Sequence, residues 1–144
     1  MKKIALLLVT LFSMTVFFTP TVNAGILSTY EEPFQILRYE EISLIKAVTY
    51  INNGTVTARG NYSVRLDNPY IVLTITLEES FNGSDWHEAE TWTFYRTTKN
   101  GSSSETYSAE NRCYYRTLVI LDLYDSDKNY IESADIYSGI EFNP

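Results

Sequence analysis

The chain has few of the residues that build covalent or metal-based sites. It contains one cysteine, Cys113, and one histidine, His87. A single cysteine excludes an intramolecular disulfide, and one His with one Cys cannot supply the usual ligand set of a zinc site. Nucleophilic catalysis would need His87 held against a Ser or Cys, and no serine stands in a Gly-x-Ser-x-Gly motif. We therefore expect a non-enzymatic protein without metal or other cofactor, in which Cys113 is a small buried hydrophobe rather than a reactive thiol.

Long apolar runs are also scarce, and the clearest is at the N-terminus. Residues 4–18 are uncharged and mostly apolar, they follow Lys2 and Lys3, and Val22-Asn23-Ala24 places small residues where a signal peptidase cuts. The run is shorter than the roughly 20 residues that a membrane span needs, which disfavours an uncleaved anchor. We expect residues 1–24 to be a cleaved signal peptide, so that the mature protein is secreted to the exterior without stable membrane insertion.

Basic side chains are outnumbered. Eighteen acidic residues stand against eleven basic ones, which gives a net charge of −7 at pH 7, and loss of Lys2 and Lys3 with the signal makes it −9. A chain this acidic repels phosphate backbones and anionic membrane surfaces. We therefore expect no nucleic-acid partner.

The rest of the chain predicts a linker and one all-β domain. Residues 25–40 include Pro33 and no sustained apolar period, so we interpret them as a linker, with the domain at 41–144. Strand-like runs alternate there with turn residues at short spacing. In the third run, Leu73 and Ile75 should face the core, and Thr74 and Thr76 should face outward. Seven strands are expected, at 44–51, 55–64, 70–79, 86–95, 105–107, 113–124 and 130–137, with a polar loop at 97–103.

Seven short strands favour a seven-stranded antiparallel sandwich of immunoglobulin-like type. The sixth run carries Tyr115, Thr117, Val119, Leu121 and Leu123 on one face. This pattern resembles the Tyr-x-Val-x-Val strand of fibronectin type III and immunoglobulin-like domains.

A wider resemblance covers nearly all of the mature chain. It rests on the signal peptide and on the following segments: Asn52-Asn53-Gly54, the run 73–78, Asn82-Gly83-Ser84-Asp85-Trp86 with Trp92, Tyr114-Tyr115-Arg116, Tyr124-Asp125 and Tyr137-Ser138. Together they resemble a family of small secreted proteins of Gram-positive bacteria that is known only as uncharacterised. The resemblance implies the sandwich and the secretion, and it brings no catalytic residues.

A carbohydrate site is one candidate for function. If the fourth strand alternates strictly, Trp86 and Trp92 share a face, with Glu88 and Glu90 between them. Two indoles with carboxylates between them would suit a sugar, whose apolar ring face stacks on an aromatic ring. The alternative is that one or both tryptophans pack between the sheets, with a bulge near Ala89 that resets the alternation.

A protein-contact face is the second candidate. If the sixth strand turns Val119 inward, Leu118 and Ile120 face outward, and the same argument turns Val48 and Tyr50 outward on the first strand. Apolar residues gathered outward on one sheet would mark a partner surface, although scattered surface apolar residues are normal. We therefore expect a secreted binding or interaction module with a protein or carbohydrate ligand, and the alternative is a carbohydrate-binding module centred on the two tryptophans.

The turn at 125–129 has a weak calcium-loop signal. Asp125, Asp127 and Asn129 have the one-three-five spacing of such a loop. Tyr130 stands where the loop needs Gly, and Ile136 stands where it needs Glu. A plain Asp- and Asn-rich hairpin turn explains the same residues, so we expect no metal here.

Overall fold

The computed structural model describes residues 39–144, so the predicted signal peptide and nearly all of the predicted linker lie outside the described residues. Within this range the chain forms eight strands and no helix. They are β1 (Ile42–Asn52), β2 (Thr55–Val64), β3 (Tyr70–Ser80), β4 (His87–Arg96), β5 (Asn100–Ser108), β6 (Cys113–Tyr124), β7 (Tyr130–Tyr137) and β8 (Glu141–Asn143). Nothing helical between residues 39 and 144 has the length and apolar character that a bilayer crossing requires. The prediction of an all-β domain is confirmed.

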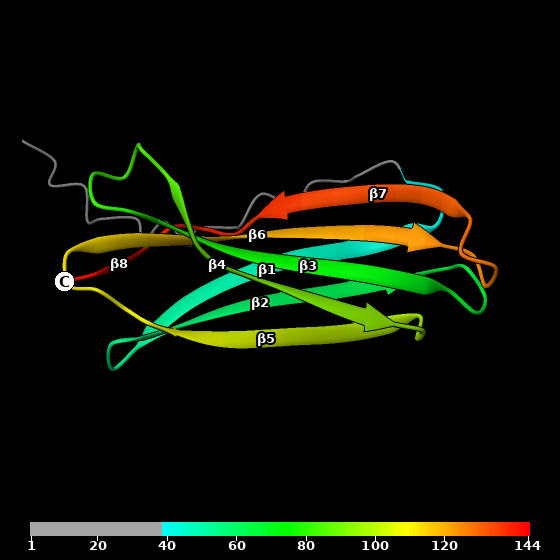
Figure 1. Cartoon of the computed structure of the whole chain (residues 1–144), viewed down its shortest axis with the longest axis horizontal. Helices are drawn as coiled ribbons and strands as arrows, with labels where there is room; N and C mark the ends of the chain where they lie inside the picture. Colours follow the sequence, from blue (N-terminus) through cyan, green and yellow to red (C-terminus); the bar gives the residue numbers. More distant parts are fainter. Residues whose placement is uncertain (1–38) are drawn as a thin grey trace, which may run out of the picture. The chain divides into compact units, whose positions relative to one another are not determined.

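The strands form two antiparallel sheets packed as a sandwich (Figure 1). One sheet has three strands in the order β1-β2-β5. The other has five, in the order β4-β3-β6-β7 with β8 beside β6. One face of each sheet contributes to a shared apolar core, so the predicted two-sheet sandwich is confirmed.

Inward and outward positions alternate most regularly in β3 and β6. Leu73 and Ile75 are fully buried, whereas Thr74 and Thr76 are only partly buried. In β6 the five residues predicted to share a face are all fully buried: Tyr115, Thr117, Val119, Leu121 and Leu123. The predicted register of both strands is confirmed.

The β1–β2 hairpin has the predicted Asn-Gly turn. Asn52 pairs with Thr55, so Asn53 and Gly54 are the two loop residues. Their φ angles are 49° and 71°, in the left-handed region that a type I′ turn requires at both positions. Asn and Gly adopt this region most readily, which explains why the chain reverses here.

Two predictions about the strands are wrong. The structure has eight strands rather than seven, because β8 pairs with the start of β6. In addition, β5 begins at Asn100, inside the segment predicted as a loop, and is longer than the predicted strand at 105–107. Its serines and Gly101 have low strand propensity, but they pair with β2 in continuous register, and the ring of Tyr62 packs against Gly101. Pairing with a neighbouring strand outweighs local propensity at such an edge.

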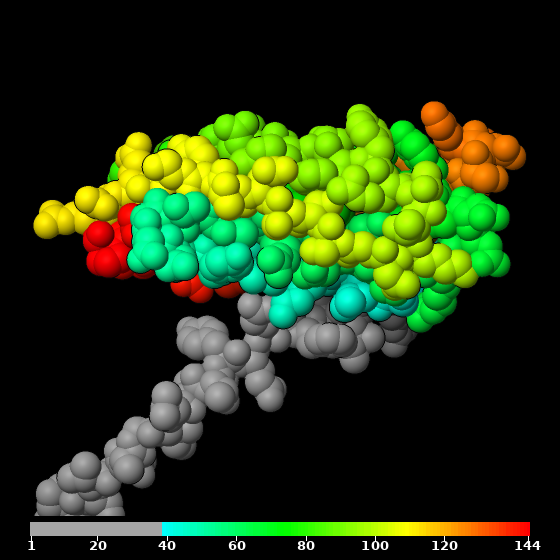
Figure 2. Space-filling model, turned by 90° about the horizontal axis from the view of Figure 1, so that it is seen from below, coloured from blue at the N-terminus to red at the C-terminus, as the bar shows by residue number. Residues whose placement is uncertain are grey.

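The edge strands β4 and β5 lie next to each other along one side of the domain (Figure 2). Arg96 on β4 donates a hydrogen bond from Nη2 to Oγ of Ser103 on β5, at 2.9 Å. Trp92 and Phe94 of β4 pack against the core from this side. Each sheet therefore has a strand edge here that pairs with no other strand of the described chain.

Candidate functional site: an aromatic sheet face

The outer faces of the two sheets carry different side chains. On the three-stranded sheet, β1 turns Leu44, Lys46, Val48 and Tyr50 outward. The outward positions of β2 and β5 hold mainly short polar residues: Thr57, Asn61, Ser63, Ser102, Ser104 and Thr106. On the five-stranded sheet, many outward positions are aromatic: Tyr70, Tyr95, Tyr114, Tyr124, Tyr130, Tyr137 and Phe142. We call this second set, together with Trp86, the aromatic face. Aromatic residues gathered on one surface are typical of binding surfaces, whereas a Ser/Thr surface is readily solvated.

Arg116 joins two of the rings at one end of the aromatic face. It lies on β6 between two buried residues, so its side chain points outward. Its guanidinium carbon is 4.2 Å from the ring centroid of Trp86 and 4.3 Å from that of Tyr137. Its Nε also donates a 2.6 Å hydrogen bond to Oε2 of Glu78 on β3. The cation thus holds an indole and a phenol in place and is itself neutralised by a carboxylate.

Four tyrosines form a row across β4, β3, β6 and β7 at the other end of the aromatic face. Their ring centroids are 6.3 Å apart for Tyr95 and Tyr70, 6.0 Å for Tyr70 and Tyr124, and 5.8 Å for Tyr124 and Tyr130. The first pair is stacked at an interplanar angle of 28°, and the other two pairs meet edge to face. The end residues Tyr95 and Tyr130 are 62% and 60% exposed. We call these four residues the tyrosine row.

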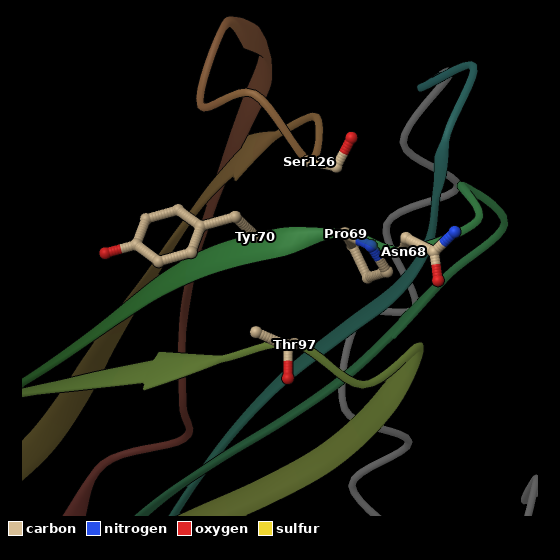
Figure 3. A pocket seen from close by; sticks show the side chains of 5 residues that line it. All are labelled: Asn68, Pro69, Tyr70, Thr97 and Ser126. Carbon is tan, nitrogen blue, oxygen red and sulfur yellow. The ribbon is translucent and has the colours of Figure 1, made fainter.

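An open surface pocket of about 330 Å³ adjoins the tyrosine row at Tyr70. Its lining comes from three segments: Asn68 and Pro69 before β3, Thr97 after β4, and Ser126 in the β6–β7 turn. Figure 3 shows Ser126 and Thr97 on either side of the segment that carries Pro69 and Tyr70. The volume is at the low end of the range for ligand pockets, about 300–1,000 Å³.

The tyrosine row is absent from the candidate residues predicted from the sequence, although its positions carry a signal. Tyr70 and Tyr130 begin strands, Tyr124 ends the strand that lies between them, and Tyr95 is next to the end of β4. Antiparallel neighbours place the start of one strand beside the end of the next. Tyrosines at successive strand ends therefore converge, but only once it is known that β3 and β6 are neighbours.

The two tryptophans do not share a face. Trp92 lies opposite the fully buried Ile75 and packs against the core, whereas Trp86 contacts Arg116 on the outer face. This corrects the hypothesis of one ledge that carries both indoles. The alternative, in which a tryptophan packs inward, is confirmed for Trp92.

The cause is a β-bulge in β4. Leu77 pairs with Glu90 and the next residue, Glu78, pairs with Glu88, so Ala89 is an extra residue without an opposite partner. Such an insertion resets the alternation of the strand, as the alternative with a bulge near Ala89 predicted. It also separates the two acids, because Glu88 pairs with outward-facing Glu78 and Glu90 pairs with inward-facing Leu77.

The residues of the predicted protein-contact face are also divided. Leu118 and Ile120 lie outward on β6, in the five-stranded sheet, and both are partly buried. Val48 and Tyr50 lie outward on β1, in the three-stranded sheet. Since the outer faces of the two sheets of a sandwich point in opposite directions, these pairs do not form one patch. Leu118 and Ile120 instead lie between the two ends of the aromatic face.

A cluster of ionisable side chains lies between the sheets near the start of β6. Burial raises the pKa of Tyr115, and the nearby Cys113 and Glu79 act in the same direction. Burial also raises the pKa of Tyr107, with further contributions from nearby carboxylates. Cys113 is fully buried, as predicted, and its Sγ donates a weak hydrogen bond to the carbonyl oxygen of Ser80 at 3.5 Å. Among residues 39–144 no group of three or more His, Cys, Asp or Glu side chains is arranged to hold a metal ion.

The 125–129 turn is held by hydrogen bonds within the turn. Oδ1 of Asp125 accepts from the backbone N–H groups of Asp127 and Asn129 at 2.9 and 2.8 Å, and Oδ2 accepts from Nδ2 of Asn129 at 2.9 Å. The side-chain bond from Asn129 is the main reason that the pKa of Asp125 is lowered. These bonds are those of an Asx-type turn, which agrees with the interpretation as a plain hairpin turn.

Comparisons with known proteins find no family. No family model matches the chain, and no curated protein matches its sequence. Among solved structures, a family 76 glycoside hydrolase from a bovine Bacteroides thetaiotaomicron strain is similar with a TM-score of 0.40 and 10% identity, over 72% of this chain and 21% of that one. Catalytically inactive OgpA from Akkermansia muciniphila, in complex with an O-glycopeptide substrate, is similar with a TM-score of 0.33 and 12% identity, over 69% of this chain and 29% of that one. The chain thus spans less than a third of either protein, and the resemblance to the secreted Gram-positive family stays a prediction.

Proposed function

We propose that this chain is a secreted, non-enzymatic binding module with an immunoglobulin-like fold, and that it binds its partner through the aromatic face. The contrast between the two outer faces carries the proposal. Tyr95, Tyr130 and Tyr137 expose 62%, 60% and 44% of their surface on one sheet, whereas the outer face of the other sheet is mainly Ser and Thr on β2 and β5, with Leu44 and Tyr50 exposed on β1. Burying such rings against a partner releases water from a large area and costs little side-chain entropy.

The strand order supports the immunoglobulin-like assignment. In that fold the first, second and fifth strands pair in one sheet, and the third, sixth and seventh pair in the other. The orders β1-β2-β5 and β3-β6-β7 follow this scheme, with β4 added beside β3. The hydroxyl oxygen of Tyr115, near the start of β6, accepts a 2.8 Å hydrogen bond from the backbone N–H of Glu110. This contact corresponds to the tyrosine corner of immunoglobulin-like domains.

Secretion is proposed from the N-terminal sequence alone. Basic residues, an apolar run and small residues up to Ala24 form a complete signal. The protein expressed in a secreting bacterial host should therefore appear in the medium with Gly25 as its first residue. Mass spectrometry that finds residues 1–24 still attached to the extracellular protein would contradict this.

The non-enzymatic assignment is supported by where the two reactive side chains lie. Cys113, the only thiol, is fully buried, and His87, the only imidazole, is exposed at the start of edge strand β4. A nucleophile must reach its substrate and needs a base within hydrogen-bond distance. Binding is therefore the function that these residues support best.

Binding to the bacterial exterior tests the proposal. The protein collected from the medium is sedimented with purified cell walls of a Gram-positive bacterium, and the bound fraction is measured. The double variant Tyr95→Ala/Tyr137→Ala removes one exposed ring from each end of the aromatic face and should weaken binding about tenfold or more.

Tyr50→Ala is the matched control, because Tyr50 is 41% exposed on the outer face of the other sheet. It should bind as the unaltered protein does. The proposal fails if the unaltered protein does not sediment with the walls, or if Tyr50→Ala weakens binding as much as the double variant.

A further inference from the structure

We propose that Asn53 is a site of spontaneous covalent modification, at which the side-chain amide is lost by deamidation and the backbone partly isomerises. The sequence contains three Asn-Gly pairs, at Asn53, Asn82 and Asn100. Asn followed by Gly is the pair most prone to this reaction, because Gly has no side chain to hinder attack by its own nitrogen. The sequence alone makes the three pairs equivalent, and the fold makes them different.

The reaction needs water and no other co-reactant. The Gly54 nitrogen loses its proton to hydroxide and attacks Cγ of Asn53, so that a C–N bond forms, the Cγ–Nδ2 bond breaks and ammonia leaves. Water then opens the resulting cyclic imide. Cleavage of the bond between the Gly54 nitrogen and Cγ gives aspartate at position 53. Cleavage of the bond between that nitrogen and the main-chain carbonyl carbon gives isoaspartate, in which the backbone runs through Cγ. The net change is amide plus water to carboxyl group plus ammonia, with no oxidation or reduction.

Both reacting groups are unbound at the first Asn-Gly pair. Asn53 and Gly54 are the loop residues of the β1–β2 hairpin, which is closed by the pairing of Asn52 with Thr55. Such a turn leaves the N–H of its second loop residue free, because the closing bond joins the flanking residues. Among residues 39–144 neither the Asn53 side chain nor the Gly54 N–H has a hydrogen-bond partner, and a Cβ at Gly54 would meet nothing within 4 Å. The Gly54 nitrogen can therefore approach Cγ without displacing any other group.

Both reacting groups are engaged at the second pair. Oδ1 of Asn82 accepts from the backbone N–H groups of Ser84 and Asp85 at 2.9 and 2.8 Å, and from Oγ of Ser80 at 3.1 Å. Nδ2 of Asn82 donates to Oδ2 of Asp85 at 2.7 Å. The attacking group is also held, since the Gly83 N–H donates to Oγ of Ser80 at 3.0 Å. Release of several such bonds before attack should slow the reaction about tenfold or more.

The third pair is held by strand pairing. Asn100 lies opposite Ser63 and Gly101 lies opposite Tyr62 in the β2–β5 ladder. The ring of Tyr62 lies so close to Gly101 that no Cβ would fit between them. Rotation of the peptide between Asn100 and Gly101 would break the ladder and displace a buried ring, so this pair should also react slowly.

The isoaspartate product should weaken the hairpin. It adds one backbone carbon to a loop of two residues, whose turn type depends on the φ angles of both. The turn is also tied to the end of β5, because the Ala109 N–H donates to the carbonyl oxygen of Gly54 at 2.8 Å. Asn53→Asp is the matched control, since it carries the same new charge without the added carbon and Asp-Gly also favours this turn.

The test follows all three pairs in one sample. The protein collected from the medium is incubated in mildly alkaline buffer, digested at intervals and analysed by mass spectrometry for conversion of each amide to a carboxyl group. In the folded protein Asn53 should react about tenfold or more faster than Asn82 and Asn100. In urea the three rates should come within about threefold of one another, because the hydrogen bonds and the ladder are then lost. The isoaspartate form, purified by ion exchange, should melt below freshly prepared Asn53→Asp.

Two variants test why Asn82 is protected. Ser80→Ala frees the Gly83 N–H, and Asp85→Ala frees Nδ2 of Asn82 at an exposed position where folding is not at risk. Each should raise the rate at Asn82 about threefold or more and leave that at Asn53 unchanged. The proposal is overturned if Asn82 or Asn100 reacts as fast as Asn53 in the folded protein, or if Asn53 reacts only in urea. It is also overturned if neither variant changes the rate at Asn82. The hairpin belongs to the sheet that does not carry the aromatic face, so each of these results leaves the proposed binding function standing.

Discussion

Trp86 and Trp92 lie on opposite faces of the five-stranded sheet, with Trp86 against Arg116 outside and Trp92 opposite Ile75 inside. The extra residue Ala89 produces this separation. The two indoles therefore have different roles: one belongs to the aromatic face, and the other closes the core beneath an edge strand.

Truncating each tryptophan in turn should show the two roles as different losses of folding stability. Trp92→Ala removes a ring that packs against the core and should cost up to the roughly 3–5 kcal/mol typical of such a change. Trp86→Ala removes a cation–π contact at the surface and should cost about 0.5–1 kcal/mol. Denaturant unfolding of both variants measures the difference. If Trp86→Ala is the more damaging change, the assignment of the two faces is wrong.

The third strand gives a second test of the core. Leu73 is fully buried, and Leu73→Ala should cost about 2–5 kcal/mol because it leaves a cavity. Thr74 faces outward, so Thr74→Ala should cost less than half as much. Urea titration of the pair decides, and equal losses would contradict the inward and outward assignment of β3.

The Tyr115–Glu110 contact predicts a pH dependence at alkaline pH. At neutral pH, Tyr115→Phe should cost about 1–2 kcal/mol, because the backbone N–H of Glu110 loses its acceptor. Burial raises the pKa of Tyr115 above its usual 10.0. The contribution of the neutral Tyr115 phenol to the free energy of unfolding is therefore complete below pH 10, and it declines as the pH rises through the raised pKa. Phe cannot ionise, so the stability gap between the two proteins should narrow above pH 10. A gap that stays constant or widens would contradict the buried, neutral phenol.

The hydrogen bonds to Asp125 predict that the 125–129 turn loosens at acidic pH. The pKa of Asp125 is lowered from 3.8, first by the side-chain hydrogen bond from Asn129 and then by the backbone N–H groups of the turn. The turn should therefore stay formed at pH values above the unfolded-state pKa of Asp125. It should loosen as the pH falls through the lowered pKa of Asp125 in the folded protein. Carboxyl NMR should show Asp125 titrating below 3.8, and Asn129→Ala should move the midpoint upward. An unchanged midpoint in that variant would show that Asn129 is not the cause.

Local patterns in the sequence predict most of the strands, whereas the candidate site depends on pairings between strands. The alternation around Leu73 and the turn at Gly54 are local, and both are confirmed. The early start of β5 does not follow from the local sequence pattern, because residues such as Gly101 form a strand only through pairing with β2. The bulge at Ala89 shifts every later side chain of β4, and no local pattern fixes such an insertion. The tyrosine row needs the register of four strands at once, so the sequence alone could not assemble it.

Protection of individual tyrosines tests the central claim, binding through the aromatic face, most directly. The secreted protein is treated with a tyrosine-acetylating reagent with and without Gram-positive cell walls, and each modified residue is measured by mass spectrometry. Tyr95, Tyr130 and Tyr137 are exposed on the aromatic face, and Tyr50 is exposed on the opposite sheet as an internal control. The account predicts that walls protect the first three and leave Tyr50 as reactive as before. Protection of Tyr50 with the other three unaffected would contradict it.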